Sequence, residues 1–176
     1  MFMKIIDSIF EKVKLLELSV REDSRGVMHV TYNEKDLSEL GICFKVKEYR
    51  VYTMPMKGTF FGIHYQDPVF PQAKLVSVIQ GKGLDYVVDL RPDSKTYKQW
   101  KAVELCADNA MAIYIPEGYG HAFLSLEDNT IQQFAIDEYF KADHTKQINY
   151  KDPQIGLSLP LDNIILSDYD KNAPYL

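Results

Sequence analysis

The chain has 176 residues, a length that suits one domain with a substantial core and is short for two. Hydrophobic residues make up 46% and charged residues 26%, which excludes a disordered chain. The formal net charge is −5 with no dense basic block, which argues against nucleic-acid binding. We therefore expect a single domain over residues 1–176. A local cationic pocket for a phosphorylated small molecule stays open.

Cysteines and apolar runs bear on the compartment. Cys43 and Cys106 lie far apart and lack the Cys-x-x-Cys spacing, which is typical of reduced thiols in the cytosol. Charges such as Lys4 and Asp7 interrupt the mildly apolar start of the chain. No run approaches the roughly 20 apolar residues of a membrane span, and no small-residue cleavage site follows. We expect a cytoplasmic protein without a membrane partner.

Taken in chain order, the predicted elements are mostly short strands. Helical signal is confined to residues 5–16, which have a weak 3.6-residue period, and to residues 33–41. Strand-type runs then follow at residues 50–66, 73–80, 84–90, 99–105, 110–116, 121–126 and 130–140. Gly81-Lys82-Gly83 separates two of these runs and predicts a hairpin. The tail from residue 152, rich in Pro, Asp and Asn, predicts an ordered irregular extension.

Many short antiparallel strands with Gly- and Pro-rich turns predict an all-β sandwich or barrel. The order of the elements does not separate an immunoglobulin-like sandwich from a jelly roll. The chain has twelve Tyr and nine Phe, and a histidine stands in the middle of one strand. These features favour a barrel with a usable interior.

That histidine is His64, in the run "GTFFGIHYQ" at residues 58–66. A lone histidine among apolar residues is more often a core residue, but the unperturbed pKa of an imidazole, about 6.5, also suits proton abstraction. Metal-binding cupins place two histidines one residue apart, whereas Gln66 stands at that position here. The other histidines are scattered singly, so we expect no functional metal.

Lys74 begins an otherwise apolar strand. A lysine at that place either points its ammonium group into the barrel or is an ordinary exposed lysine at a strand start. Its position alone does not decide between the two.

Several segments together resemble the dTDP-4-dehydrorhamnose 3,5-epimerases, which are cupin-type jelly rolls that act on nucleotide-linked 4-keto sugars. The segments are "DSRG" (23–26), "KGTFFGIHYQ" (57–66), "PQAKLVSVIQGKGLDYVVDLRPDSKTYKQW" (71–100), "IPEGYGHAFLSL" (115–126), "NYKDPQIGLSLP" (149–160) and "LSDYDKNAP" (166–174). They follow the family's order. The resemblance implies a cupin-type jelly-roll β-barrel.

The same resemblance implies that His64 is the catalytic base, that Asp170 orients it, and that Lys74 steadies the enolate oxygen. A proton α to a ketone is weakly acidic, so its removal requires a placed base and a charge facing the oxyanion. This chemistry needs neither a metal nor a redox cofactor. The substrate-binding positions implied are Arg25, Gln66, His121 and Tyr139, with Phe61 and Phe134 at two further positions.

Those last two positions depart from the family pattern. Phe61 stands where the family usually has an arginine that contributes charge to the diphosphate site. Phe134 aligns with the family's general-acid tyrosine, and phenylalanine cannot donate a proton. Another tyrosine, such as Tyr139, would supply the hydroxyl if the register of this alignment is off.

The function implied is an isomerase that inverts C3, C5 or both in a nucleotide-linked 4-keto-6-deoxy sugar. One alternative is a divergent relative that only binds a sugar nucleotide or moves the carbonyl of a keto sugar. A metal-dependent cupin oxygenase ranks third for want of a histidine pair. The partners expected are the nucleotide sugar, dTDP-linked by resemblance, and a second copy of the chain, since the family dimerises by strand exchange near its N-terminus.

Overall fold

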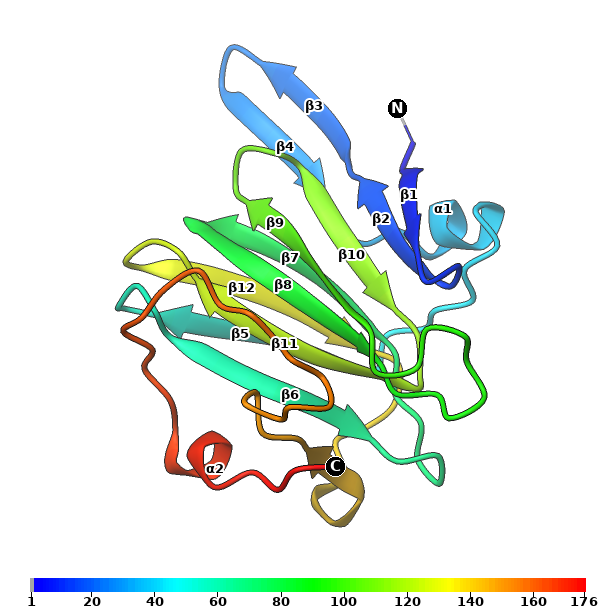
Figure 1. The fold of residues 1–176 in the computed structure, drawn as a ribbon. Coiled ribbons are helices and arrows are strands. Elements are labelled where there is room, and N and C mark those ends of the chain that lie inside the picture. The colour runs from blue at the N-terminus through cyan, green and yellow to red at the C-terminus, as the bar shows by residue number, and fades with distance from the viewer. Residues whose placement is uncertain (1) are drawn as a thin grey trace.

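The computed structural model describes residues 2–176 and consists mainly of two facing antiparallel sheets (Figure 1). The six-stranded sheet has the order β1 (Lys4–Ile9), β2 (Val13–Glu17), β10 (Met111–Ile115), β7 (Lys74–Gln80), β12 (Thr130–Ile136) and β5 (Glu48–Met54). The five-stranded sheet has the order β13 (Thr145–Gln147), β6 (Phe60–Gln66), β11 (Tyr119–Ser125), β8 (Lys82–Asp89) and β9 (Trp100–Cys106). A separate hairpin is formed by β3 (Ser19–Asp23) and β4 (Gly26–Val30). The predicted all-β, cupin-type barrel is confirmed.

An apolar cluster fills the space between the two sheets. Its buried members are Val13, Met54, Val76, Val78, Val87, Leu105, Ile113, Ile115, Tyr119 and Phe123. They converge because alternate side chains of each strand point to the same face. Each such burial stabilises the fold by about 1.5–3 kcal/mol. Phe61 and Phe134 pack against this cluster but are only partly buried, and they mark where the interior opens to solvent.

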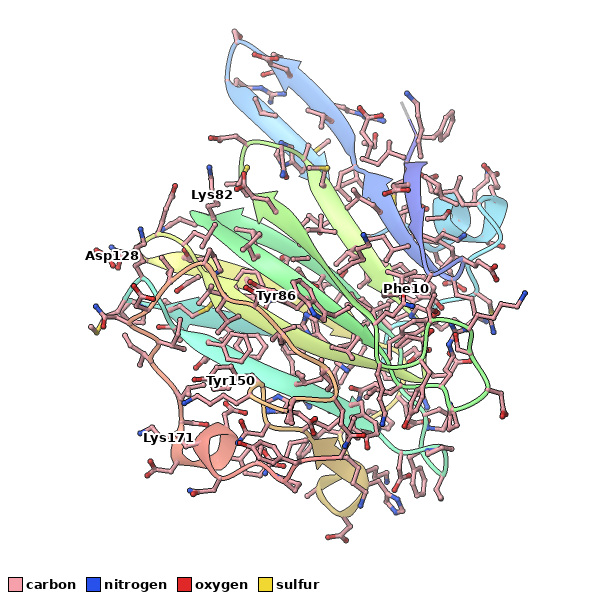
Figure 2. All side chains as sticks on the ribbon, viewed as in Figure 1. Phe10, Lys82, Tyr86, Asp128, Tyr150 and Lys171 are labelled. Atoms are coloured by element: carbon pink, nitrogen blue, oxygen red, sulfur yellow. The ribbon has the colours of Figure 1, made fainter. Side chains whose placement is uncertain are left out.

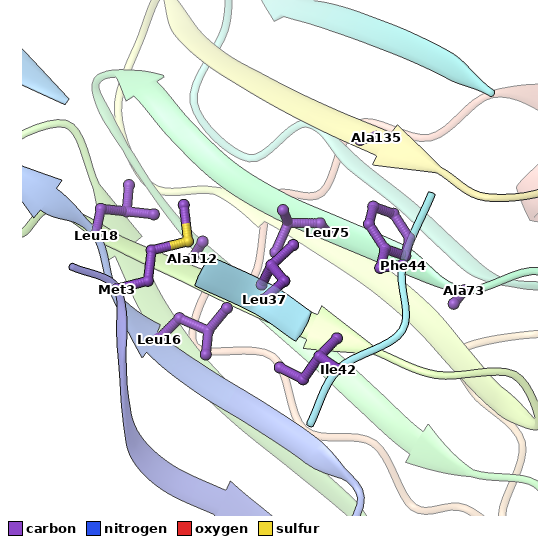
Figure 3. Close-up of a cluster of buried hydrophobic side chains, with 10 residues drawn as sticks. All are labelled: Met3, Leu16, Leu18, Leu37, Ile42, Phe44, Ala73, Leu75, Ala112 and Ala135. Carbon is purple, nitrogen blue, oxygen red and sulfur yellow. The ribbon is translucent and has the colours of Figure 1, made fainter. Parts of the chain in front are cut away.

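The outer face of the six-stranded sheet is covered by α1 (Glu34–Glu39) and the loop after it (Figure 3). Asn33 caps the helix, because its side chain accepts hydrogen bonds from the backbone N–H groups of Lys35 and Asp36. Leu37 and Phe44 then pack against the side chains of β2, β7 and β10. The helix predicted at residues 33–41 is confirmed.

The outer face of the five-stranded sheet is covered by the C-terminal extension. Its apolar side chains are Ile148, Tyr150, Ile155, Leu157, Leu159, Leu161, Ile164 and Leu166. Tyr150 packs on Phe60 at 5.4 Å between ring centroids, and Phe60 in turn packs on Tyr86. Tyr86 and Tyr150 are labelled in Figure 2. The extension then ends in α2 (Asp168–Lys171) beside β6 (Figure 1). The prediction of an ordered, largely irregular tail is confirmed.

The helix predicted over residues 5–16 is wrong, because this segment forms the antiparallel pair of β1 and β2. Phe10 and Glu11 make the turn with positive φ angles of 49° and 67°. Val13 faces the barrel interior, whereas Leu16 faces the outer cluster. A helical period would have placed both on one face; in a strand, residues three apart point to opposite faces.

The hairpin predicted around Gly81 is also wrong. β7 pairs with β10 and β12, and β8 pairs with β9 and β11, so the glycine links one sheet to the other. The strand predicted over residues 130–140 ends at Ile136. Beyond it, the Asp137 carboxylate accepts a hydrogen bond from the backbone N–H of Ala73.

Among residues 2–176, none of the helices has the length and apolar character to cross a membrane.

Candidate active site

An irregularity in β6 brings Phe61 and His64 to the same cavity. His64 is opposite His121 and Phe61 is opposite Phe123, so β6 has one residue more than β11 between these pairs. Gly62 occupies the irregularity with a φ of +113°, and a Cβ there would lie 2.5 Å from the Cβ of Ala122. Glycine is therefore required directly after Phe61.

His64 forms a hydrogen bond with Asp170. The two groups meet at 2.6 Å between Nε2 and Oδ1; the carboxylate side chain is 4% exposed and the imidazole 28%. Ser167 donates its hydroxyl to the other carboxylate oxygen at 2.9 Å and accepts the backbone N–H of Asp170 at 3.1 Å. An ionised carboxylate in this place holds the ring proton on Nε2, which leaves the lone pair of Nδ1 for chemistry.

The imidazole lies between two adjoining cavities. The larger, of about 540 Å³, is lined by Arg50, Val51, Tyr52, Thr59, Phe60, Phe61, His64, Phe134, Ile165, Leu166, Ser167, Tyr169 and Asp170. The smaller, of about 100 Å³, is lined by Arg50, Phe61, His64, Tyr65, Gln66, Gln72, Lys74, His121, Phe134, Phe140 and Thr145. Four residues line both cavities: Arg50, Phe61, His64 and Phe134. We call these four residues the waist.

Lys74, Asp85 and His121 form a buried polar group at the smaller cavity. Lys74 is 8% exposed, and burial lowers its pKa to about 8, although the Asp85 carboxylate opposes this shift. His121 and Asp85 meet at 2.8 Å between Nε2 and Oδ2. Burial raises the pKa of Asp85, and the His121 side chain counteracts it. The ammonium group of Lys74 is therefore a desolvated donor at the inner end of the site.

Gln66 lines the smaller cavity, but its amide group is used to hold the neighbouring backbone. It donates to the carbonyl oxygens of Phe70 at 2.8 Å and Tyr139 at 3.4 Å, and it accepts the N–H of Lys141 at 2.8 Å. This geometry suits a residue that positions the cavity wall.

Two predicted site residues lie away from His64. Arg25 is at the tip of the β3–β4 hairpin, which projects from the barrel at the end far from α2 (Figure 1), and it pairs with Asp23 at 2.6 Å. The ring of Tyr139 lies under the ammonium group of Lys47 at 5.3 Å and lines neither cavity. Tyr139 therefore lies outside the two cavities that His64 lines, and the role of its hydroxyl group stays a prediction.

Phe61 and Phe134 both line the two cavities at the imidazole, while their roles stay predictions. The ring of Phe61 lies 6.3 Å from that of His64, 6.1 Å from that of His121 and 5.3 Å from that of Tyr52, measured between centroids. Phe134 enters the waist from β12, in the opposite sheet.

The sequence reasoning missed Arg50, Tyr52 and Tyr169, which all line the larger cavity. Arg50 and Tyr52 are two apart in one strand, which was the available signal for a shared face. Tyr169 directly precedes Asp170, and its ring lies 5.8 Å from that of His64. Within residues 2–176, no group of three or more His, Cys, Asp and Glu side chains could hold a metal ion.

Comparison with known proteins decides the family. The model of the dTDP-4-dehydrorhamnose 3,5-epimerase family matches residues 8–176. The chain belongs to this family. A dTDP-4-dehydrorhamnose 3,5-epimerase from Methanothermobacter thermautotrophicus is 34% identical over 172 residues, covering 96% of this chain and 92% of the relative. The resemblance inferred from the sequence is thus confirmed, and this family member is an enzyme of the isomerase class.

Solved structures of epimerases have the same fold. The crystal structure of dTDP-4-dehydrorhamnose 3,5-epimerase from Bacillus anthracis, with TDP and PPi bound, has a TM-score of 0.96 and 38% identity and covers 99% of both chains. The structure of a 3'-monoepimerase from Streptomyces bikiniensis, in complex with dTDP-quinovose, has a TM-score of 0.85 and 33% identity. The match covers 93% of this chain and 83% of the monoepimerase chain. The family member described here is therefore similar to both double and single epimerases.

Proposed function

We propose that the chain, acting as one cupin domain over residues 1–176, inverts C3, C5 or both in a dTDP-linked 4-keto-6-deoxy sugar. The observation that carries this proposal is the hydrogen bond between His64 and Asp170 beside a cavity whose inner end holds Lys74. It provides a base, an orienting carboxylate and a cation in one place.

At each inverted carbon the reaction removes one proton and adds another. Nδ1 of His64 takes the proton from the carbon next to the ketone, and the electron pair of that C–H bond moves to the C4 oxygen as an enolate. The ammonium group of Lys74 faces the developing charge, which is worth more in a desolvated site than in water. When the enolate collapses, the carbon takes a proton from water on its opposite face, and His64 releases the proton it took to the solvent. The substrate and the product therefore have the same oxidation state.

The alternative of a binding protein or carbonyl-moving isomerase has less support. It was motivated by Phe61 and Phe134, which carry neither charge nor hydroxyl. The arrangement of base, carboxylate and buried cation argues against mere binding, which needs none of these groups. A carbonyl-moving isomerase would need the same base, and the match of the epimerase family model to residues 8–176 favours epimerisation over it. The apolar wall at Phe134 favours fewer inverted centres rather than a different reaction.

The active form in this proposal is a cytoplasmic homodimer. β5 is at an edge of its sheet and exposes Tyr49 and Val51, and the projecting hairpin exposes Val27 and Met28. Exposed apolar edges of this kind are seldom left unpaired. Pairing of the hairpin with the β5 edge of a second copy would also give Arg25 a way to approach that copy's substrate.

Deuterium exchange tests the proposal. The protein is incubated with a dTDP-linked 4-keto-6-deoxy sugar in D₂O, and NMR follows deuterium at C3 and C5. Exchange at one or both carbons is expected, and it should be lost in His64→Asn while the thermal unfolding transition is kept. No exchange in the wild-type protein, or full exchange in His64→Asn, would contradict it.

A further inference from the structure

The two cavities contain few cations for a substrate with a diphosphate group. Among the described residues that line the two cavities, the lysine and arginine side chains are those of Arg50 and Lys74. Lys74 belongs to the cavity of about 100 Å³ and is almost fully buried. That space suits a carbonyl oxygen rather than a diphosphate. Phe61, at the waist, contributes no charge.

Arg50 differs from Lys74 in being accessible from the larger cavity. It lies in β5, directly opposite Phe134 in β12, and its side chain is 37% exposed. It belongs to the waist together with His64. An anion in the larger cavity can therefore reach the guanidinium group while the sugar lies at the imidazole.

The guanidinium group is already oriented. It lies over the ring of Phe140 at 5.1 Å, and its Nε and Nη2 donate to one carboxylate oxygen of Glu48 at 3.1 Å and 2.5 Å. Within the described part of the chain, these two bonds leave both N–H groups of Nη1 and one N–H group of Nη2 for a ligand. A planar fork held in this way suits bidentate recognition of phosphate oxygens.

We propose that Arg50 binds the diphosphate of the sugar nucleotide, and so supplies from β5 the charge that Phe61 does not supply from β6. This inference rests on the proposed function and names the residue that sets the affinity for the charged part of the substrate. Glu48 modulates that affinity, since its carboxylate competes with the diphosphate for the same guanidinium group.

Binding of dTDP and of thymidine separates this role from a structural one. In ligand-observed NMR titrations, Arg50→Gln should weaken dTDP about 10- to 100-fold and leave thymidine nearly unchanged, because only dTDP carries the diphosphate. Glu48→Gln should tighten dTDP. The matched control is Lys47→Gln, which removes a neighbouring cation that lines neither cavity and should change neither ligand.

A charge placed at residue 61 gives a second test. Phe61→Arg in the Arg50→Gln background should restore dTDP affinity, since both positions belong to the waist. Unchanged dTDP affinity in Arg50→Gln, or an equal loss of thymidine, overturns the inference. If Arg50→Gln does not fold, Glu48→Gln decides: tighter dTDP supports the inference, and unchanged or weaker dTDP overturns it. A wild-type protein that binds dTDP but shows no deuterium exchange contradicts the proposed function alone.

Discussion

Asp170 lies 2.6 Å from Nε2 of His64, although the two residues are 106 positions apart in the chain. The carboxylate reaches this place because the apolar residues of the C-terminal extension pack over the outer face of the five-stranded sheet and end in α2 beside β6. The extension is therefore part of the site as well as of the core.

Asp170→Asn should lower the deuterium exchange rate by about 10²- to 10⁴-fold. An amide can keep the shape but cannot stabilise the imidazolium that forms when His64 takes a proton. NMR measures the rate at which deuterium enters the substrate at C3 and C5, and a thermal unfolding transition shows that the variant is folded. Asp168→Asn is the matched control, because this carboxylate is in the same short helix but points to solvent. An equal loss of rate in both variants would contradict the assigned role of Asp170.

Lys74 should impose an alkaline limit on activity. Burial disfavours the charged form, so the pKa falls from 10.5 to about 8 and the ammonium group loses its proton as the pH rises through that value. If the cation steadies the enolate, the exchange rate falls as the pH rises above about 8. Rates measured from pH 6 to 10 check this directly.

Two variants show whether that limit belongs to Lys74. Lys74→Arg keeps the positive charge and should move the alkaline limit to higher pH. Lys74→Ala removes the charge and should lower the deuterium exchange rate strongly at every pH. Lys82→Ala removes a cation at the exposed start of β8, and it should keep the pH dependence of the wild-type exchange rate. A wild-type rate that stays level to pH 10 would remove Lys74 from the role of oxyanion cation.

Much of this site could be predicted from the sequence because the resemblance depends on local runs. "GIHYQ", the Lys74 strand and "LSDYDKNAP" each stand out by composition and spacing, and the structure brings His64 and Asp170 together as expected. Arg50, in contrast, was missed because it is one charged residue in an ordinary strand. Its closeness to His64 arises only when two sheets face each other.

The errors in the fold have a similar origin. Residues 5–16 have apolar side chains at helical intervals, but Val13 and Leu16 are buried in clusters on opposite faces of one sheet. Local periodicity does not report that both faces of a strand are covered. Gly81 likewise marks a turn, but which strands pair across it depends on the long-range order of the sheets.

Phe134→Tyr should raise turnover or add exchange at a second carbon. Phe134 enters the waist from the sheet opposite His64, so a hydroxyl there could donate a proton to the far face of the enolate. Deuterium at C3 and C5 is followed by NMR under identical conditions. Phe2→Tyr, at a ring that is exposed to solvent and lines neither cavity, is the control and should leave the exchange pattern unchanged. No change in Phe134→Tyr would mean that the hydroxyl position was wrongly assigned.

The proposed dimer should depend on the β5 edge. Val51 is 62% exposed on that edge, although it also lines the rim of the larger cavity, and a lysine there would place a charge in the contact. Light scattering after gel filtration should give about twice the chain mass of 20.3 kDa for the wild type and a value near the chain mass for Val51→Lys. Val69→Lys, in the loop after β6 and equally exposed to solvent, should stay dimeric. A wild-type protein that elutes as a monomer at micromolar concentration would contradict the dimer. A dimeric Val51→Lys would place the contact elsewhere than β5.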